Sequence, residues 1–145
     1  MPKLTGTIVV QRSQQEVFDY LIQLNRHGEW SPKPWRVEGD PGPLRLGTKF
    51  TSIGTVPGDK NYRNEVEVTE CTPPSRIRWE TDEKAGHFAN TFVLTPEEST
   101  TRVERTFEWP EQKGFTRLIF PLIYMLIIRP NFHKGLNLFK VRMES

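Results

Sequence analysis

The middle of the chain alternates between apolar and polar residues, which predicts β-strands. The alternation is clearest at 62–70, where Val66 and Val68 fall on one side and Glu65 and Glu67 on the other. Similar segments are separated by turn-forming Pro and Gly residues. Alternation of this kind is typical of antiparallel strands with one face in water. We therefore expect six strands, at 35–37, 48–56, 62–70, 76–81, 88–94 and 102–109.

The two ends of the chain have different patterns. Residues 4–10 predict a further strand, and the S-x-x-E sequence from Ser13 to Glu16 predicts a capped helix that continues to about Asn25. From about Gly114 the apolar spacing becomes helical and stays so nearly to the end of the chain. Apolar residues cover a broad part of this last helix, so we expect it to be largely surrounded rather than half-exposed.

This order of elements predicts an α+β fold in one domain, residues 1–145. The apolar face of the sheet needs a cover, and only the C-terminal helix is long and apolar enough to provide it. A strongly bent antiparallel sheet that grips this helix is the simplest such arrangement. Because a curled sheet need not close tightly on the helix, we expect a cavity between the two.

Four segments resemble a known superfamily. They are IVVQRSQQEVFDYLIQLNRHGEWSP, VEGDPGPLRLGTKF, the strand from Pro74 to Trp79, and the strand TRVERTFEW with the apolar helix that follows it. Over essentially its whole length the chain resembles START lipid-transfer domains, the birch-pollen-allergen family and bacterial polyketide cyclase/dehydrase-like proteins, together the SRPBCC superfamily. The resemblance implies a helix-grip fold, in which a curved seven-stranded antiparallel sheet wraps around a long C-terminal helix, with short helices between strands 1 and 2. It also implies a hydrophobic small molecule bound in the cavity, sometimes with catalysis, although the chemistry of a site does not transfer with a fold.

Composition supports a core with space inside it. Only 35% of the residues are apolar, and the mean hydropathy is −0.58. The apolar set nevertheless includes nine Phe, four Trp and three Tyr, with only two Ala. Large aromatic side chains fit strands better than helices. A core built from a few large side chains can leave room for a ligand.

Charge and cysteine content limit the partners and the compartment. Twenty basic and 18 acidic residues give a net charge of +2, without the clustered basic excess of a nucleic-acid-binding protein. The charge is unevenly distributed along the chain. Residues 112–145 carry six basic residues and one acidic residue (+5), whereas residues 1–111 carry 14 basic and 17 acidic residues (−3). A single cysteine, Cys71, excludes an internal disulfide, and the N-terminus lacks the apolar core of a signal peptide. We therefore expect a cytoplasmic protein, and either a monomer or a homodimer.

The longest apolar run, 118–128, contains Pro121 and spans 11 residues. A bilayer-spanning helix takes roughly 20 residues, so we expect no stable membrane insertion. A helix with basic residues at intervals can instead touch a membrane surface. We favour packing in the core, because the sheet needs this apolar side as its cover, and leave a transient membrane contact open.

Polar side chains on the predicted inner face give the strongest indication of a site. If Val103 and Phe107 face the helix, Arg105 does too, and the same alternation turns Tyr62, Asn64 and Asn90 inward. A guanidinium keeps its proton, so a buried arginine needs an anion or several acceptors. We therefore predict an apolar pocket with a few orienting polar groups; the alternative is that Arg105 pairs with a local carboxylate or reaches the rim. The predicted ligand-binding residues are Trp35, Phe50, Tyr62, Asn64, Val66, Trp79, Phe88, Asn90, Phe92, Arg105, Phe107, Leu122 and Met125, with Trp30 as a lid near the entrance.

Neither a metal site nor a nucleophile emerges from the sequence. His27, His87 and His133 fall on three different elements, whereas a metal needs about four convergent ligands. Cys71 has no partner identifiable from spacing, so we interpret it as an inert thiol. We expect no metal and no cofactor.

Three functional hypotheses remain. The first is binding or transport of a hydrophobic small molecule or lipid, with no nucleic-acid partner. The second is an enzyme of the polyketide cyclase/dehydrase kind, in which Arg105 stabilises an enolate and Tyr62 donates a proton. No inward Asp, Glu or His is predicted to serve as a base, which favours the first. The third is a protein-interaction or quinone-binding module.

Overall fold

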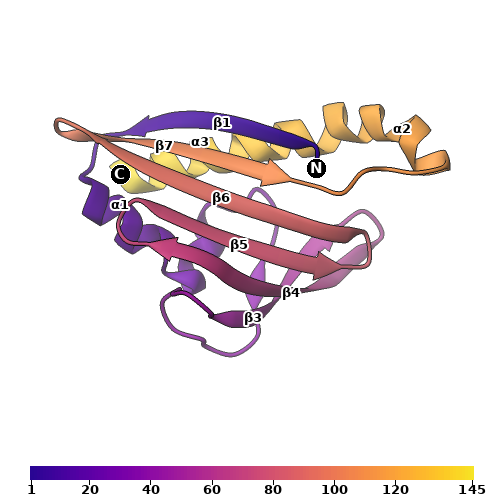
Figure 1. The fold of residues 1–145 in the computed structure, drawn as a ribbon, viewed down its shortest axis with the longest axis horizontal. Coiled ribbons are helices and arrows are strands. Elements are labelled where there is room, and N and C mark those ends of the chain that lie inside the picture. Colours follow the sequence, from indigo (N-terminus) through magenta and orange to yellow (C-terminus); the bar gives the residue numbers. More distant parts are fainter.

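The computed structural model describes residues 1–145 and contains one seven-stranded antiparallel sheet (Figure 1). The strand order is β1-β7-β6-β5-β4-β3-β2, so the first strand of the chain pairs with the last. This confirms the predicted α+β helix-grip architecture and its seven strands. The strands are β1 (Lys3–Val10), β2 (Arg36–Val37), β3 (Lys49–Val56), β4 (Asp59–Thr72), β5 (Arg76–Glu83), β6 (Gly86–Glu97) and β7 (Thr100–Glu108).

The helices are placed between β1 and β2 and after β7. They are α1 (Gln14–Leu21), the 3-10 helix η1 (Leu24–Glu29), α2 (Phe115–Ile123), the π-helical turn η2 (Tyr124–Ile128) and α3 (Arg129–Glu144). The last three form one continuous helix. Two prolines, Pro121 and Pro130, flank the π-helical turn. Because proline supplies no backbone N–H and its ring crowds the carbonyl four residues earlier, a locally widened turn is expected near them.

The capping box predicted from the sequence starts α1. Ser13 Oγ accepts a hydrogen bond from the backbone N–H of Glu16 (3.2 Å) and donates one to Glu16 Oε1 (3.0 Å). The helix ends at Leu21 and not near Asn25, because the carbonyl of Ile22 accepts from the N–H of Leu44 (2.8 Å). The chain then continues as η1, which carries the predicted polar stretch back into the core.

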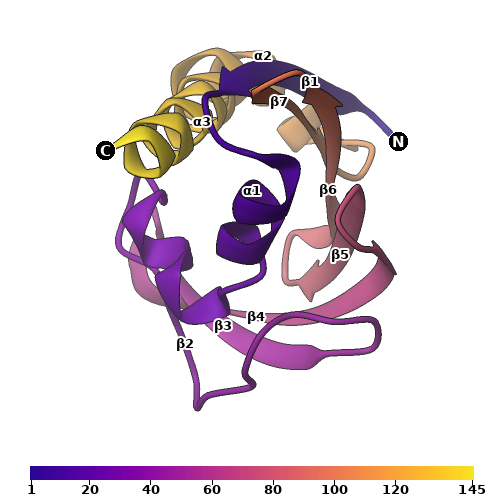
Figure 2. The same cartoon turned by 90° about the vertical axis from the view of Figure 1, so that its left-hand side faces the viewer.

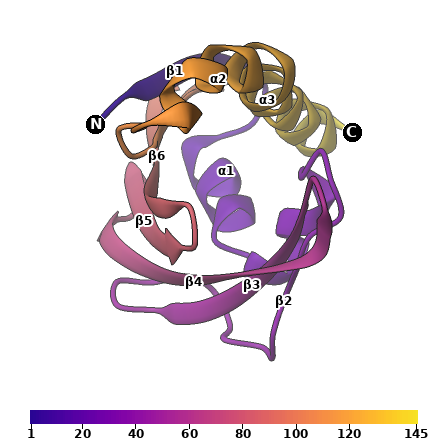
Figure 3. The same cartoon turned by 90° about the vertical axis from the view of Figure 1, so that its right-hand side faces the viewer.

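Helix α1 lies inside the curved sheet, with α2 and α3 across the open side (Figures 2 and 3). Its residues Val17 and Leu21 are fully buried, as are Phe92 on β6, Val103 on β7 and Phe139 on α3. The expectation that the C-terminal helix alone covers the sheet was therefore incomplete. Burial of these apolar side chains by two helices holds the sheet in its curved form.

The C-terminal helix packs on the sheet over only half its length. In α3, Phe132, Leu136 and Phe139 are buried, and the helix lies directly on β1. In α2 and η2 no residue is buried, and Figure 1 shows α2 projecting past the N-terminal end of β1. The prediction of a largely surrounded helix is thus wrong for 115–128. Apolar spacing showed which residues share a side of the helix, but not that this side extends beyond the sheet.

Candidate functional site

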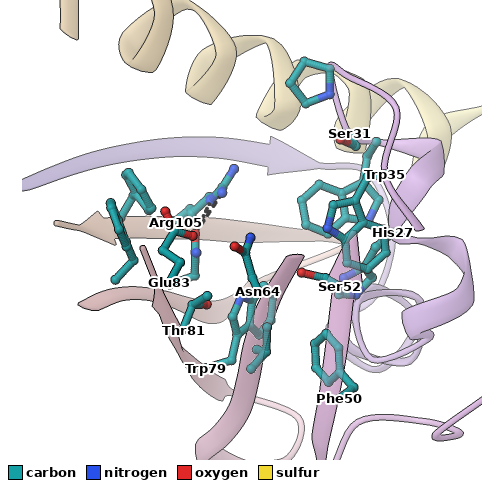
Figure 4. Close-up of a pocket in the computed structure, with 16 residues that line it drawn as sticks. His27, Ser31, Trp35, Phe50, Ser52, Asn64, Trp79, Thr81, Glu83 and Arg105 are labelled. Carbon is teal, nitrogen blue, oxygen red and sulfur yellow. Dashed lines mark hydrogen bonds between the residues drawn. The ribbon is translucent and has the colours of Figure 1, made fainter. Parts of the chain in front are cut away.

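A pocket of about 270 Å³ lies between the concave face of the sheet and the segment that follows η1. Strands β3 to β7 supply one wall, and the aromatic residues around η1 supply the other (Figure 4). Its lining residues are His27, Trp30, Ser31, Pro32, Trp35, Phe50, Ser52, Asn64, Val66, Trp79, Thr81, Glu83, Phe88, Asn90, Arg105 and Phe107.

Nine of the thirteen residues predicted to bind a ligand line this pocket. They are Trp35, Phe50, Asn64, Val66, Trp79, Phe88, Asn90, Arg105 and Phe107. The strand register brings them together, since Asn90 pairs with Phe107 and with Trp79, its neighbours on β7 and β5. Their placement follows from the alternation of inward and outward side chains; their contact with a ligand stays a prediction.

The other four predicted residues lie outside the pocket. Tyr62 donates a hydrogen bond to a lining residue, Glu83, and Phe92 is fully buried behind the lining. Leu122 on α2 and Met125 in η2 are 61% and 66% exposed, so their assignment to the pocket is corrected. They were assigned to it because the helix was expected to lie wholly under the sheet. Trp30 is buried against Phe92 and Phe139 and is not an exposed lid.

Arg105 is the charged group of the pocket. Its Nε and Nη2 both donate to Asn90 Oδ1, at 3.0 and 2.8 Å. No carboxylate forms an ion pair with it, and Nη1 makes no hydrogen bond. A guanidinium has five N–H donors, so three of them are uncommitted. The alternative in which a local carboxylate pairs with Arg105 is not what the structure has.

Aromatic rings surround this guanidinium. Its Cζ lies 5.0 Å from the ring centre of Phe132, 5.5 Å from Phe92 and 6.0 Å from Trp30. Ring faces attract a cation, but they do not replace an anion. Burial lowers the pKa of Arg105 to about 10, which leaves the side chain charged at neutral pH.

Helix α3 closes the pocket above Arg105 by means of a glycine. A Cβ atom at Gly135 would stand 3.5 Å from Arg105 Nη1 and 3.6 Å from the carbonyl oxygen of Trp30. The helix backbone therefore passes directly over the guanidinium, with no side chain between them. Trp30 Nε1 is a fully buried donor of another lining residue, and it lacks an acceptor. Unpaired buried donors are rare in native proteins and need an explanation.

His27 is a buried histidine that the sequence did not place in the pocket. Its Nε2 lies 2.6 Å from the carbonyl oxygen of Leu21, so Nε2 carries the proton and donates it, which leaves Nδ1 as an acceptor. Burial, together with the charge of Arg105, lowers the pKa of His27 to about 4. The ring also packs against Trp30 and Trp35, at 4.9 and 5.6 Å between centres. His27 is therefore a neutral histidine at physiological pH.

Glu83 is the second titratable residue of the pocket that the sequence did not predict. Tyr62 Oη donates to Glu83 Oε1 at 3.3 Å, and the amide of Asn64, oriented to satisfy its partners, donates to Oε2 at 3.0 Å. Burial raises the pKa of Glu83 above its ordinary value. The predicted absence of an inward acid was wrong, because β5 runs to Glu83 and not to Thr81. Trp79 and Thr81 point inward, and Glu83 is the next residue in the same alternation. Extending the predicted strand by two residues would therefore have placed Glu83 on the inner face.

The pocket thus combines an aromatic wall with two separate polar centres. One is the uncompensated guanidinium of Arg105, and the other is the Tyr62–Asn64–Glu83 hydrogen-bonded group. Figure 4 shows Arg105, Asn64 and Glu83 on the sheet wall, opposite His27 and Trp35. Such a lining fits an apolar molecule that carries an oxygen acceptor, because a few polar groups suffice to orient a ligand in an apolar pocket.

The fold is a helix-grip fold with a pocket between the concave face of the sheet and the segment that follows η1. The family model described as "Polyketide cyclase / dehydrase and lipid transport" matches residues 1–144, and the chain belongs to that family. No curated protein matches the sequence.

Solved structures of bacterial proteins share the whole fold. Protein TTHA0849 from Thermus thermophilus is 19% identical, with a TM-score of 0.75 over 98% of this chain and 97% of the other. Protein CV1439 from Chromobacterium violaceum is 14% identical, with a TM-score of 0.73 over 100% and 99%. A conserved protein from Geobacillus kaustophilus is 16% identical, with a TM-score of 0.71 over 98% and 95%. At these identities the similarity establishes the fold and not the ligand.

Proposed function

We propose that the protein binds a hydrophobic small molecule, ring-containing or lipid-like, whose anionic or carbonyl oxygen accepts hydrogen bonds from Arg105. The uncompensated guanidinium carries this proposal. A half-buried cation in an aromatic pocket, whose only side-chain acceptor is one neutral amide oxygen, is stabilised by a ligand oxygen that completes its hydrogen bonds. The family description, which includes lipid transport, supports the same class of ligand.

The size and lining of the pocket narrow the ligand. A volume of about 270 Å³ is slightly below the range of small-molecule sites, which is about 300–1,000 Å³. Trp30, Trp35 and Trp79 offer flat apolar faces. These features favour a compact aromatic or single-chain molecule over a lipid with two full acyl chains. We place this carrier in the cytoplasm, where its single thiol, Cys71, would stay reduced, and it can act as a monomer or a homodimer.

The test is ligand binding by Arg105 variants. Native mass spectrometry of protein purified without detergent should show bound apolar mass, and a panel of aromatic and aliphatic carboxylates and ketones should raise the melting temperature. Arg105→Leu should weaken the best carboxylate by about 1.5–3 kcal/mol, or roughly 10- to 150-fold, the range for a hydrogen bond to a charged group. Arg102→Leu is the matched control, because Arg102 is on the same strand and exposed.

Two results would overturn the proposal. One is protein that is free of ligand as purified and is stabilised by no member of the panel. The other is equal affinity of the wild type and the Arg105→Leu variant, which would remove Arg105 from the site.

A second candidate function follows from Glu83. With its raised pKa and its hydrogen bond from Tyr62, Glu83 is the base that a polyketide cyclase/dehydrase-type enzyme requires. In such a reaction Glu83 takes a proton from the carbon beside a ketone, and Arg105 stabilises the enolate oxygen while the enolate carbon attacks a second carbonyl of the same molecule. The new alkoxide takes the proton back from Glu83, and this hydroxyl then leaves as water together with a proton from the neighbouring carbon. Incubation with diketones that bind, followed by mass spectrometry, would detect loss of water. Glu83→Gln should abolish that loss while leaving ketone binding in place.

A further inference from the structure

An unbroken apolar stripe lies exposed along α2 and η2. It consists of Phe115, Leu118, Ile119, Leu122, Met125 and Leu126, whose spacing of three and four residues places them on one side of the helix. Leu118 is 78% exposed and Leu126 67%. Soluble proteins rarely leave a contiguous apolar surface of this kind uncovered without a partner for it.

The rest of the chain does not cover the stripe. The opposite side of the helix is the one that packs on the protein, through Phe120 and Tyr124 against Trp109, at 5.9 and 5.7 Å between ring centres. Leu118 and Leu122 each lie two positions from Phe120, which corresponds to a rotation of about 200° around the helix axis. Because Phe120 faces Trp109, Leu118 and Leu122 face away from it. Figure 3 shows α2 on the outer edge of the molecule. The stripe therefore faces outward.

The charged residues that flank the stripe between Lys113 and Lys134 are all positive. Lys113 and Arg117 lie at its start, and Arg129 and Lys134 follow its end; all four are exposed. No Asp or Glu occurs between Lys113 and Met143. An apolar side flanked by cations and free of acids is complementary to a bilayer surface that contains anionic lipids.

We infer that α2 and η2 dock in the surface of a membrane bearing anionic lipids, with the apolar stripe in the boundary between headgroups and acyl chains. This inference is independent of the pocket and of its ligand. It replaces the expected core packing of 115–128 with an external partner. Docking there brings the protein to a bilayer, the phase in which hydrophobic molecules are concentrated.

The helix lies on the membrane and does not cross it. By length and composition the 30-residue helix Phe115–Glu144 is long and apolar enough to span a bilayer. Its second half is nevertheless occupied, because Phe132, Leu136 and Phe139 are buried in the protein. The free part from Phe115 to Leu126 is only about 17 Å long, against a hydrocarbon core of about 30 Å.

A second copy of the chain fits the stripe less well. In a symmetric dimer the same side of each helix would meet the other, so the four cations of one copy would face those of its partner without an intervening acid. A membrane surface supplies the opposite charge. The dimer is therefore the alternative that the experiment must separate.

The experiment is sedimentation of the full chain with vesicles of phosphatidylcholine, with and without phosphatidylglycerol. We expect binding to the anionic vesicles that high salt reverses. Leu118→Ser combined with Leu122→Ser should lower the partition coefficient roughly tenfold or more. The control is Leu46→Ser combined with Val141→Ser, which removes two apolar side chains of similar exposure (65% and 62%) outside the stripe and should bind as the wild type does.

The cations are tested in the same assay. Arg117→Gln combined with Arg129→Gln should weaken binding to anionic vesicles and flatten its salt dependence, whereas Arg45→Gln combined with Arg102→Gln should do so much less. Absence of binding to anionic vesicles, or binding unaffected by the serine pair, would overturn the inference. A dimer that the serine pair dissociates would assign the stripe to a second copy, and protein that resists high-salt extraction would replace docking with insertion.

Discussion

Arg105 on β7 donates two hydrogen bonds to one oxygen of Asn90 on the adjacent strand β6. Asn90 thus orients the guanidinium without neutralising it. A carboxylate at the same position would have done both. The choice of an amide leaves a full positive charge inside the pocket, beside a neutral His27.

Replacing this amide by a carboxylate should remove the reason for an anionic ligand to bind. Asn90→Asp preserves the shape of the side chain and places an anion on Arg105. We expect affinity for a carboxylate ligand to fall by about 1.5–3 kcal/mol, since the ligand then competes with an internal partner. Titration calorimetry with the best carboxylate of the panel measures this.

The control is Asn137→Asp, the same change at an exposed position on α3. Equal affinity of both variants would mean that the ligand does not use Arg105. A variant that binds weakly but melts no earlier than the wild type would separate loss of the site from loss of the fold.

Local sequence features predicted most of the fold. The Ser13–Glu16 cap, the strand alternation and the Pro-Gly turns each determine a short segment. The resemblance to helix-grip proteins predicted that the strands join in one seven-stranded antiparallel sheet. The alternation also placed Asn90 and Arg105 on the inner face before any partner was known. Such inferences succeed because a strand turns alternate side chains to opposite faces whatever lies around it.

Features that depend on distant packing were not predictable in the same way. His27 and Trp30 lie in the polar segment RHGEWSPKP, yet both are buried. Their burial depends on the position of η1, which contacts both the sheet and α3. The sequence did not predict Glu83 as an inward residue, because β5 extends two residues beyond the predicted end of the strand at Thr81. Leu118 is exposed because the sheet does not extend below this part of the helix. The apolar spacing of the helix contains no information about the length of the sheet.

Acid should destabilise the protein through His27. The folded-state pKa of His27 is about 4, below its ordinary value of 6.5, because burial disfavours the charged ring. Above pH 6.5 the ring of His27 is neutral in both the folded and the unfolded protein, so His27 makes the free energy of unfolding no more or less dependent on pH there. Between 6.5 and about 4 the unfolded chain takes up a proton that the folded protein does not, so the free energy of unfolding falls by up to about 3 kcal/mol.

Urea unfolding across this pH range, for the wild type and His27→Gln, isolates the contribution. The variant should be less stable at pH 8, and its deficit should shrink as the pH falls towards 4. His133→Gln is the matched control, since His133 is an exposed histidine on α3. A constant difference between wild type and His27→Gln at all pH values would contradict a neutral buried His27.

Glu83 should make the protein less stable as the pH rises. Burial raises its folded-state pKa above the ordinary value of 4.5, so the folded protein holds a proton that the unfolded chain has released. That advantage is present at low pH and is lost as the pH rises through the folded pKa. Glu83→Gln keeps an acceptor for Tyr62 and carries no charge.

We therefore expect Glu83→Gln to melt at a higher temperature than the wild type at neutral pH, with a smaller difference near pH 4. Glu67→Gln on the outer face of β4 should show no such gain. Differential scanning calorimetry at neutral pH and near pH 4 measures the melting temperatures of the wild type and of both variants. A variant that is less stable than the wild type at neutral pH would show that Glu83 is stabilised as an anion.

Gly6 on β1 should prove necessary for the packing of α3. A Cβ atom there would stand 2.7 Å from Phe132 Cε1 and 2.9 Å from Leu136 Cδ1, both side chains of the buried half of the helix. Ala at this position must push α3 away from the sheet, at a cost of about 1–3 kcal/mol, as in other overpacked cores. Gly54→Ala is the control, because its Cβ would meet only Trp35 Cδ1 at an ordinary 3.7 Å. Urea unfolding should show a clear loss for Gly6→Ala and little for Gly54→Ala, and equal stability of the two would mean that α3 does not lie against β1 as closely as described.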